Sequence, residues 1–121
     1  MKSVLIVEDD DLLGRMYTKL LENAGYKVDL QVSGAGALTA LSSSKFDLIL
    51  LDIMLGGDMN GFDVLEKVRK NQKLAETKVI IATNLDSEEK VATEIGVDGY
   101  FSKTKVKPEE ILDKIIEIIG K

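Results

Sequence analysis

The chain has 121 residues, of which 45% are apolar and 31% are charged, the size and composition of one globular domain. A net charge of −5 argues against non-specific binding of nucleic acid, and the lack of cysteine excludes disulfides and thiolate metal sites. No apolar run approaches the roughly 18 residues of a membrane span. The strand predicted directly after Ser3 leaves no room for a signal peptide. We therefore expect a cytoplasmic protein that contacts neither membranes nor nucleic acid directly.

The first half of the chain predicts two strands, each followed by a helix. The run Val4–Val7 is typical of a strand buried on both faces, and Lys27–Val32 predicts the second strand. The helix between them ends at Gly25, and Ser33 caps a shorter second helix. Apolar residues of the first helix share one face at helical spacing, namely Leu13, Met16, Tyr17, Leu20, Leu21 and Ala24.

The second half repeats this alternation three times. The predicted strands cover residues 48–51, 79–82 and 99–102. The helices that follow run from Phe62 to about Asn71, from the cap at Asp86 to Gly96 with Val91, Ala92 and Ile95 on the apolar face, and from Pro108 onwards. Gly56–Gly61 is a loop by composition, Asp86 and Glu89 form a predicted capping box, Gly96 ends that helix, and Pro108 suits the first turn of the last one. Such alternation predicts an α/β fold with a doubly wound parallel sheet and helices on both faces.

Polar residues follow four of the predicted strands. They are Glu8 and Asp9, Asp52, Thr83 and Lys103. Because the carboxyl ends of parallel strands meet at one edge of the sheet, these side chains should converge there. The three acids can hold a hard divalent cation such as Mg²⁺, while the hydroxyl and the ammonium can bind anionic oxygens. The edge therefore predicts a site for a phosphoryl group on a carboxylate.

With these motifs the chain resembles the two-component response-regulator receiver domains, from Lys2 to about Ile119. The matching segments are Val4–Asp10, Leu50–Leu55, Asn60–Gly61, Ile81–Thr83 and Gly99–Lys103. The resemblance implies one receiver domain over residues 1–121, with five parallel strands in the flavodoxin-like order 2-1-3-4-5. Since the last predicted helix ends about two residues before the end of the chain, we expect no output domain.

The resemblance also implies a function. Asp52 would accept a phosphoryl group from a partner histidine kinase or histidine phosphotransfer protein, since this chain has no histidine. The surface of the fourth helix, fifth strand and fifth helix would then switch, toward a downstream protein or a second copy of the chain. Such a domain catalyses its own phosphorylation and dephosphorylation but is not a turnover enzyme.

The family motif implies a role for each acid at the edge. Asp52 is the phosphoacceptor and a magnesium ligand, although an isolated aspartate at a strand end is more often a turn cap. Asp9 binds Mg²⁺ directly, Glu8 acts through a water, and the backbone carbonyl of Met54 supplies another oxygen. Asp10 is the rival for these metal roles, but capping of the first helix is favoured for it.

On the anion side, the resemblance assigns phosphoryl binding to Thr83, Asn84 and Lys103. Thr83 and Tyr100 would form the switch, against the alternative of Tyr100 as a half-buried residue of an edge strand. Asn84 stands where the family has a small residue, so its amide either narrows access to the site or binds the phosphoryl group. Thr104 replaces the family's usual proline, which predicts either a trans bond after Lys103 or a rebuilt loop.

Two other functions compete with this one, and one of them stays open. The changes at Asn84 and Thr104 allow a degenerate receiver that binds a partner without phosphorylation. A magnesium-dependent phosphohydrolase is disfavoured, because it would need a second acid two residues after Asp52, where Met54 stands. Met54 and Leu85, two residues after the acceptor and the threonine, are bulky and apolar. They should exclude an attacking water, which predicts slow loss of the phosphoryl group.

Overall fold

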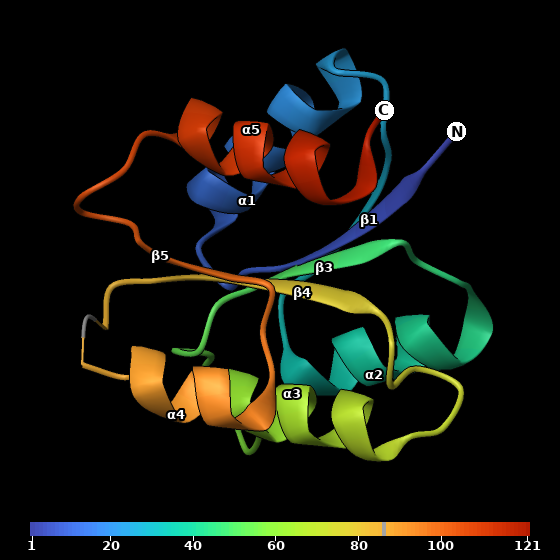
Figure 1. Cartoon of the computed structure of the whole chain (residues 1–121), viewed down its shortest axis with the longest axis vertical. Coiled ribbons are helices and arrows are strands. Elements are labelled where there is room, and N and C mark those ends of the chain that lie inside the picture. Colours follow the sequence, from blue (N-terminus) through green and yellow to red (C-terminus); the bar gives the residue numbers. More distant parts are fainter. Residues whose placement is uncertain (86) are drawn as a thin grey trace.

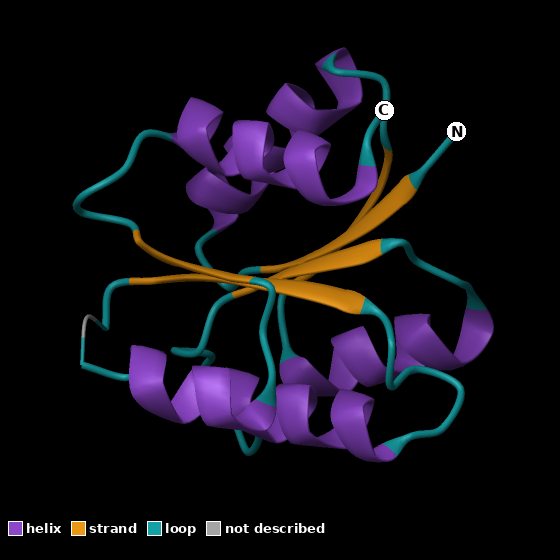
Figure 2. Ribbon diagram, viewed as in Figure 1, coloured by secondary structure: helices purple, strands orange, loops and turns teal. Residues whose placement is uncertain are grey.

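Five strands and five helices alternate along residues 1–85 and 87–121, the part of the chain that the computed structural model describes. They are β1 (Ser3–Val7), α1 (Asp11–Asn23), β2 (Lys27–Gln31), α2 (Gly34–Ser43), β3 (Leu48–Leu51), α3 (Gly61–Lys70), β4 (Lys78–Thr83), α4 (Glu89–Ile95), β5 (Gly99–Ser102) and α5 (Pro108–Ile119). All neighbouring strands are parallel, in the order β2-β1-β3-β4-β5. Helices α1 and α5 cover one face and α2, α3 and α4 the other (Figures 1 and 2). The predicted flavodoxin-like fold is confirmed.

The three central strands are buried on both faces. Successive side chains of a strand point to opposite faces, so Leu5 and Val7 pack with the layer of α2, α3 and α4, whereas Val4 and Ile6 pack with α1 and α5. All four are at most 1% exposed. Burial of such an aliphatic side chain contributes about 1.5–3 kcal/mol. The core therefore holds firmly the strand ends from which the polar residues project.

The predicted ends of the first two helices are confirmed. The Asp10 carboxylate accepts a hydrogen bond of 3.0 Å from the Leu13 amide at the start of α1, and the Ser33 hydroxyl accepts one from Gly36 at the start of α2. Gly25, after α1, has a φ of 101°, which favours glycine. Asp10 is thereby engaged in capping its own helix.

One predicted core residue of α1 is on the surface. Met16 was expected on the inner face, but it is 41% exposed. The helix buries a stripe centred on Tyr17 and Leu21 against the sheet and α5. Met16 lies one residue, or about 100° of helix rotation, away from the centre of this stripe.

The guanidinium of Arg69 joins three segments at the amino-terminal edge of the sheet. Its Nε donates to the carbonyl of Gly96, which ends α4, at 2.9 Å. Its Nη1 donates to the carbonyls of Ala75 and Thr77 at 3.0 and 2.6 Å, and its Nη2 lies 3.5 Å from Asp98. Arg69 thus ties the end of α3 to the segments that lead into β4 and β5.

The two ends of α4 are held differently. Gly96 terminates the helix with a φ of 119° and carries the contact to Arg69. At the other end, Glu88 is the N-cap residue and makes no side-chain capping bond. The predicted capping box of this helix depends on Asp86, which lies outside the described residues.

Candidate functional site

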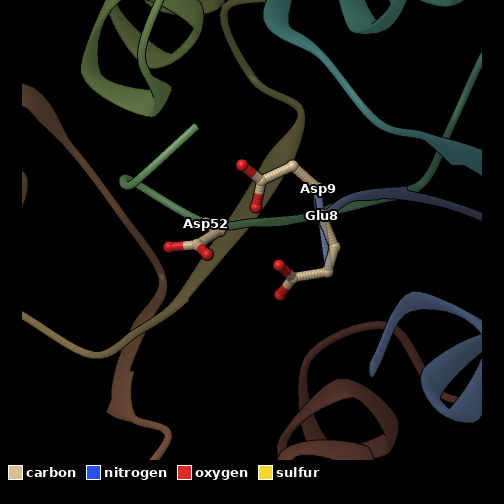
Figure 3. A group of neighbouring side chains, drawn as sticks. All are labelled: Glu8, Asp9 and Asp52. Carbon is tan, nitrogen blue, oxygen red and sulfur yellow. The ribbon is translucent and has the colours of Figure 1, made fainter. Parts of the chain in front are cut away.

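Three carboxylates gather where β1 and β3 end (Figure 3). Val7 is paired with Leu51, so the residues that follow them in sequence are neighbours at the edge of the sheet. One ligand oxygen each of Glu8, Asp9 and Asp52 lies within 4.8 Å of the others. Glu8 and Asp52 are only 3% and 5% exposed, whereas Asp9 is open to solvent.

The ammonium of Lys103 bridges the two buried acids. Its Nζ lies 2.5 Å from Glu8 Oε1 and 2.7 Å from Asp52 Oδ2. Burial raises the pKa of Glu8 above its ordinary value, even though the hydrogen bond and charge of Lys103 act in the opposite direction. Burial lowers the pKa of Lys103, but hydrogen bonds with Asp52 and Glu8 outweigh this effect and leave it raised, so the ammonium stays charged.

This arrangement fits a divalent cation. When all four groups are charged, three carboxylates face a single ammonium, which leaves a net charge of −2 in a mostly buried space. Oxygen ligands from two or three carboxylates suit Mg²⁺, which keeps several of its waters. Asp9, exposed and beside the buried pair, is the carboxylate with the best access to a hydrated ion.

The loop after β3 is organised around these carboxylates. The Met54 amide donates to Asp52 Oδ1 at 3.0 Å, and the Gly56 amide donates to Asp9 Oδ2 at 3.1 Å. Asn60 then caps α3 in a reciprocal capping box with Asp63. The loop therefore fixes the orientation of two of the acids and begins α3 close to the end of β3.

The first residue of α3 packs directly against the backbone of Asp52. A Cβ atom at Gly61 would lie 2.2 Å from the carbonyl oxygen of Asp52 and 2.6 Å from Ile53 Cα. The Gly61 amide also donates to the carbonyl of Ile53 at 2.9 Å. This close approach gives a physical reason for glycine in the Asn60–Gly61 motif.

The carboxylates and Lys103 line a pocket of about 360 Å³. Its lining residues are Glu8, Asp9, Asp10, Leu13, Tyr17, Asp52, Met54, Asn84, Lys103, Val106 and Pro108. Met54 and Asn84 were expected here. Tyr17 was not, since helical spacing indicated only that it faces inward, and the pocket forms because α1 packs beside the end of β1.

Thr83 and Leu85 lie beside the pocket without lining it. Thr83 is the last residue of β4 and is fully buried, and its hydroxyl accepts a hydrogen bond of 3.3 Å from the Leu85 amide. The side chain of Leu85 packs against the core on the face of α2, α3 and α4. The carbonyl of Leu85 accepts a hydrogen bond from the Tyr100 hydroxyl. Hydrogen bonds thus connect Thr83 to Tyr100 through Leu85.

The segment after β5 forms a turn that carries Lys103. None of the described peptide bonds is cis, in agreement with the trans bond predicted before Thr104. The hydroxyls of Ser102 and Thr104 are 3.0 Å apart, and the amides of Lys105 and Val106 both donate to the carbonyl of Ser102. Lys103 therefore projects from a tight, hydrogen-bonded turn.

Comparison with known proteins identifies the family. The model of the response regulator receiver domain matches residues 4–116. Response regulator ArlR of Staphylococcus saprophyticus is 39% identical over 120 residues, which cover 95% of this chain and 51% of that protein. The probable transcriptional regulator ycf29 of Porphyra purpurea is 33% identical over 119 residues, which cover 97% of this chain and 56% of that protein. The chain spans about half the length of these curated relatives.

Solved structures show the same fold. A CheY-like response regulator receiver domain protein from Methanospirillum hungatei superposes with a TM-score of 0.86 at 34% identity, over 97% of this chain and 92% of that one. The response regulator TrrA from Thermotoga maritima, in complex with Mg(2+)-BeF, gives a TM-score of 0.86 at 27% identity, over 98% and 99% of the two chains. No helix in the described residues is long and apolar enough to span a membrane. The chain belongs to the response regulator receiver domain family.

Proposed function

We propose that this receiver domain accepts a phosphoryl group on Asp52, in the presence of Mg²⁺, from a phosphohistidine of a partner histidine kinase or histidine phosphotransfer protein. The observation that carries the proposal is the convergence of Glu8, Asp9 and Lys103 on Asp52 in one pocket. We expect the chain to meet these partners in the cytoplasm.

Transfer to Asp52 exchanges one bond for another. A carboxylate oxygen of Asp52 forms a bond to phosphorus, and the bond between phosphorus and the donor nitrogen breaks, so the imidazole leaves with that electron pair. The Met54 amide and Lys103 hold the two oxygens of Asp52 at 3.0 and 2.7 Å, which orients the carboxylate before the donor arrives. Lys103 then binds an oxygen of the incoming group.

The metal would be held by Asp9 directly, by Asp52, by Glu8 through a water and by the backbone carbonyl of Met54. Bound there, Mg²⁺ would offset the negative charge that builds up between the carboxylate and the phosphoryl oxygens. Without it, the donor would approach three carboxylates, of which only the two buried ones are paired with an ammonium, that of Lys103. This charge balance is the reason why we expect phosphorylation to depend on the cation.

The switch that we propose starts at Thr83. Its hydroxyl holds the Leu85 amide, and the Leu85 carbonyl holds the Tyr100 hydroxyl. A phosphoryl group on Asp52 that draws the Thr83 hydroxyl toward itself would release Leu85 and, with it, Tyr100. The surface of α4, β5 and α5 would change as a result, and a downstream protein or a second copy of the chain would read the change. Asn84, which lines the pocket, is the other expected phosphoryl contact.

The alternative is a degenerate receiver that binds its partner without phosphorylation. The full burial of Thr83 and its bond to Leu85 favour this alternative, because the hydroxyl is not presented to the pocket. Binding of beryllofluoride, a phosphoryl mimic, separates the two functions. A phosphoacceptor binds it together with Mg²⁺, whereas a degenerate receiver shows no linked binding of the two.

The acceptor is tested with acetyl phosphate and Mg²⁺, followed by intact-mass measurement. The protein should gain one phosphoryl group that is stable in acid and labile in base, and Asp52→Asn should abolish the gain. Asp58→Asn, at an exposed position of the loop after β3, is the matched control and should be labelled like the unmodified protein. Labelling of Asp52→Asn to the unmodified level would overturn the assignment.

A further inference from the structure

Tyr17 brings a buried phenol to the acceptor pocket. It lies on α1, is 3% exposed, and lines the pocket together with Glu8, Asp52 and Lys103. Its ring packs in the core between α1, α5 and the sheet. The site as proposed above makes no use of this hydroxyl.

The hydroxyl of Tyr17 has no hydrogen-bond partner among the described residues. Among the described residues, every side-chain nitrogen or oxygen that is completely shielded from solvent has a hydrogen-bond partner. Since the Tyr17 oxygen has none, it must keep some contact with solvent. In a residue that is 3% exposed and lines the pocket, that contact is the pocket itself. Tyr26, equally buried, differs in this respect, because its hydroxyl donates to the carbonyl of Gly120 at 2.5 Å.

The charged groups of the site act on this phenol. Burial raises the pKa of Tyr17; Lys103 acts to lower it, and Glu8 and Asp52 act to raise it. The hydroxyl therefore keeps its proton at neutral pH and is available as a hydrogen-bond donor to an anionic oxygen.

The Glu8 carboxylate loses one hydrogen-bond donor when Lys103 changes partner. The Lys103 ammonium now pairs with Glu8 Oε1 as well as with Asp52. A phosphoryl group on Asp52 extends beyond the carboxylate, and an ammonium that follows its oxygens moves away from Glu8. Glu8 keeps the Asp10 amide at 3.2 Å on Oε2, and the water that would link it to Mg²⁺ fills one more acceptor position. A buried carboxylate that loses one of its donors is stabilised by a replacement.

We propose that Tyr17 is a positioning residue of this site: its hydroxyl donates a hydrogen bond to the Glu8 carboxylate when Lys103 turns to the phosphoryl group. The inference rests on the proposed phosphoacceptor function. Tyr17 thereby holds the Glu8 carboxylate in place while Lys103 is engaged elsewhere, and it acts on the reaction through Glu8 without touching the phosphoryl group.

Tyr17→Phe removes the hydroxyl and keeps the ring. Since the hydroxyl has no protein partner in the ligand-free state, the free energy of unfolding measured in urea without ligand should stay unchanged. The affinity for beryllofluoride at saturating Mg²⁺, measured by titration calorimetry, should fall about tenfold, because a hydrogen bond to a charged group is lost. Tyr26→Phe is the matched control and should do the reverse, lowering the free energy of unfolding and leaving the affinity unchanged.

A double-mutant cycle identifies the acceptor of the bond. In a Glu8→Ala background, Tyr17→Phe should have no further effect on beryllofluoride affinity. An undiminished tenfold effect in that background would overturn the assignment to Glu8, and equal affinities of Tyr17→Phe and the unmodified protein would overturn the inference as a whole. If the unmodified protein itself shows no Mg²⁺-linked beryllofluoride binding, the proposed function fails, and the inference fails with it.

Discussion

Gly61 offers a sharp test of how the end of β3 is supported. A glycine-to-alanine substitution in the first turn of a helix ordinarily raises stability by up to about 1 kcal/mol, because alanine loses less backbone entropy on folding. At Gly61 the new Cβ would lie 2.2 Å from the carbonyl oxygen of Asp52 and 2.6 Å from Ile53 Cα. Both are backbone atoms that cannot rotate away, so α3 or the segment after β3 must move.

The magnitude follows from this clash. Side-chain Cβ atoms keep at least 3.0 Å from such neighbours, against the 2.2 Å found here, so a displacement of nearly an ångström is needed. Overpacking of a dense core costs about 1–3 kcal/mol, and immovable backbone favours the upper end of that range. After subtraction of the helix gain, Gly61→Ala should lower the free energy of unfolding by about 2 kcal/mol. Mg²⁺ binding should weaken as well, because the displaced backbone is that of Asp52.

Gly56 is the matched control in the same loop. A Cβ there would meet only Asp9 Oδ2, at an ordinary 3.6 Å, and the φ of Gly56 is not positive. Gly56→Ala should therefore change stability by less than about 0.5 kcal/mol. The midpoints of urea unfolding, measured side by side, report both effects. Equal midpoints for Gly61→Ala and the unmodified protein, or an equal loss in Gly56→Ala, would refute the reasoning.

Two further predictions concern the metal and the lifetime of the phosphoryl group. Asp9→Ala should weaken Mg²⁺ binding by about a hundredfold and Glu8→Ala by about tenfold, because loss of a direct ligand costs more than loss of one that acts through a water. Calorimetric titration with Mg²⁺ measures both effects. If Asp10→Ala weakened Mg²⁺ binding more than Asp9→Ala does, the metal would lie one residue further along the chain. Met54→Asn should shorten the lifetime of the phosphoryl group by about tenfold, equivalent to about 1.4 kcal/mol of activation free energy. The reason is that the side-chain amide of the new asparagine can orient a water in the pocket. Leu85→Glu should change this lifetime little, since Leu85 does not line the pocket. The lifetime is measured as phosphate release after the phosphodonor has been removed. An unchanged lifetime in Met54→Asn would contradict the prediction.

The convergence of the acids could be predicted from the sequence because it depends on few variables. In a parallel sheet, neighbouring strands end at the same edge, and a strand run followed by an acid places that acid there. Glu8, Asp9 and Asp52 follow the paired residues Val7 and Leu51, and they meet as expected. The capping role of Asp10 was predictable for a similar reason, since a cap depends only on residues within one turn of helix.

Features that depend on packing between elements were not predictable in the same way. The burial of Thr83 and its bond to Leu85 depend on the path of the chain after β4. The place of Tyr17 at the pocket and the exposure of Met16 depend on how α1 rotates against the sheet and α5. Helical spacing fixes which side chains share a face, but it leaves the centre of that face uncertain by about one residue, or 100°.

Arg69 makes the two ends of α4 unequal. The guanidinium ties the end of the helix at Gly96 to the segments before β4 and β5, whereas the side chain of Glu88, at the other end, makes no capping hydrogen bond. If the surface of α4 switches as we propose, we expect the beginning of the helix to move more than its end at Gly96. The entry to β5, held by the same arginine through Asp98, should then keep its place.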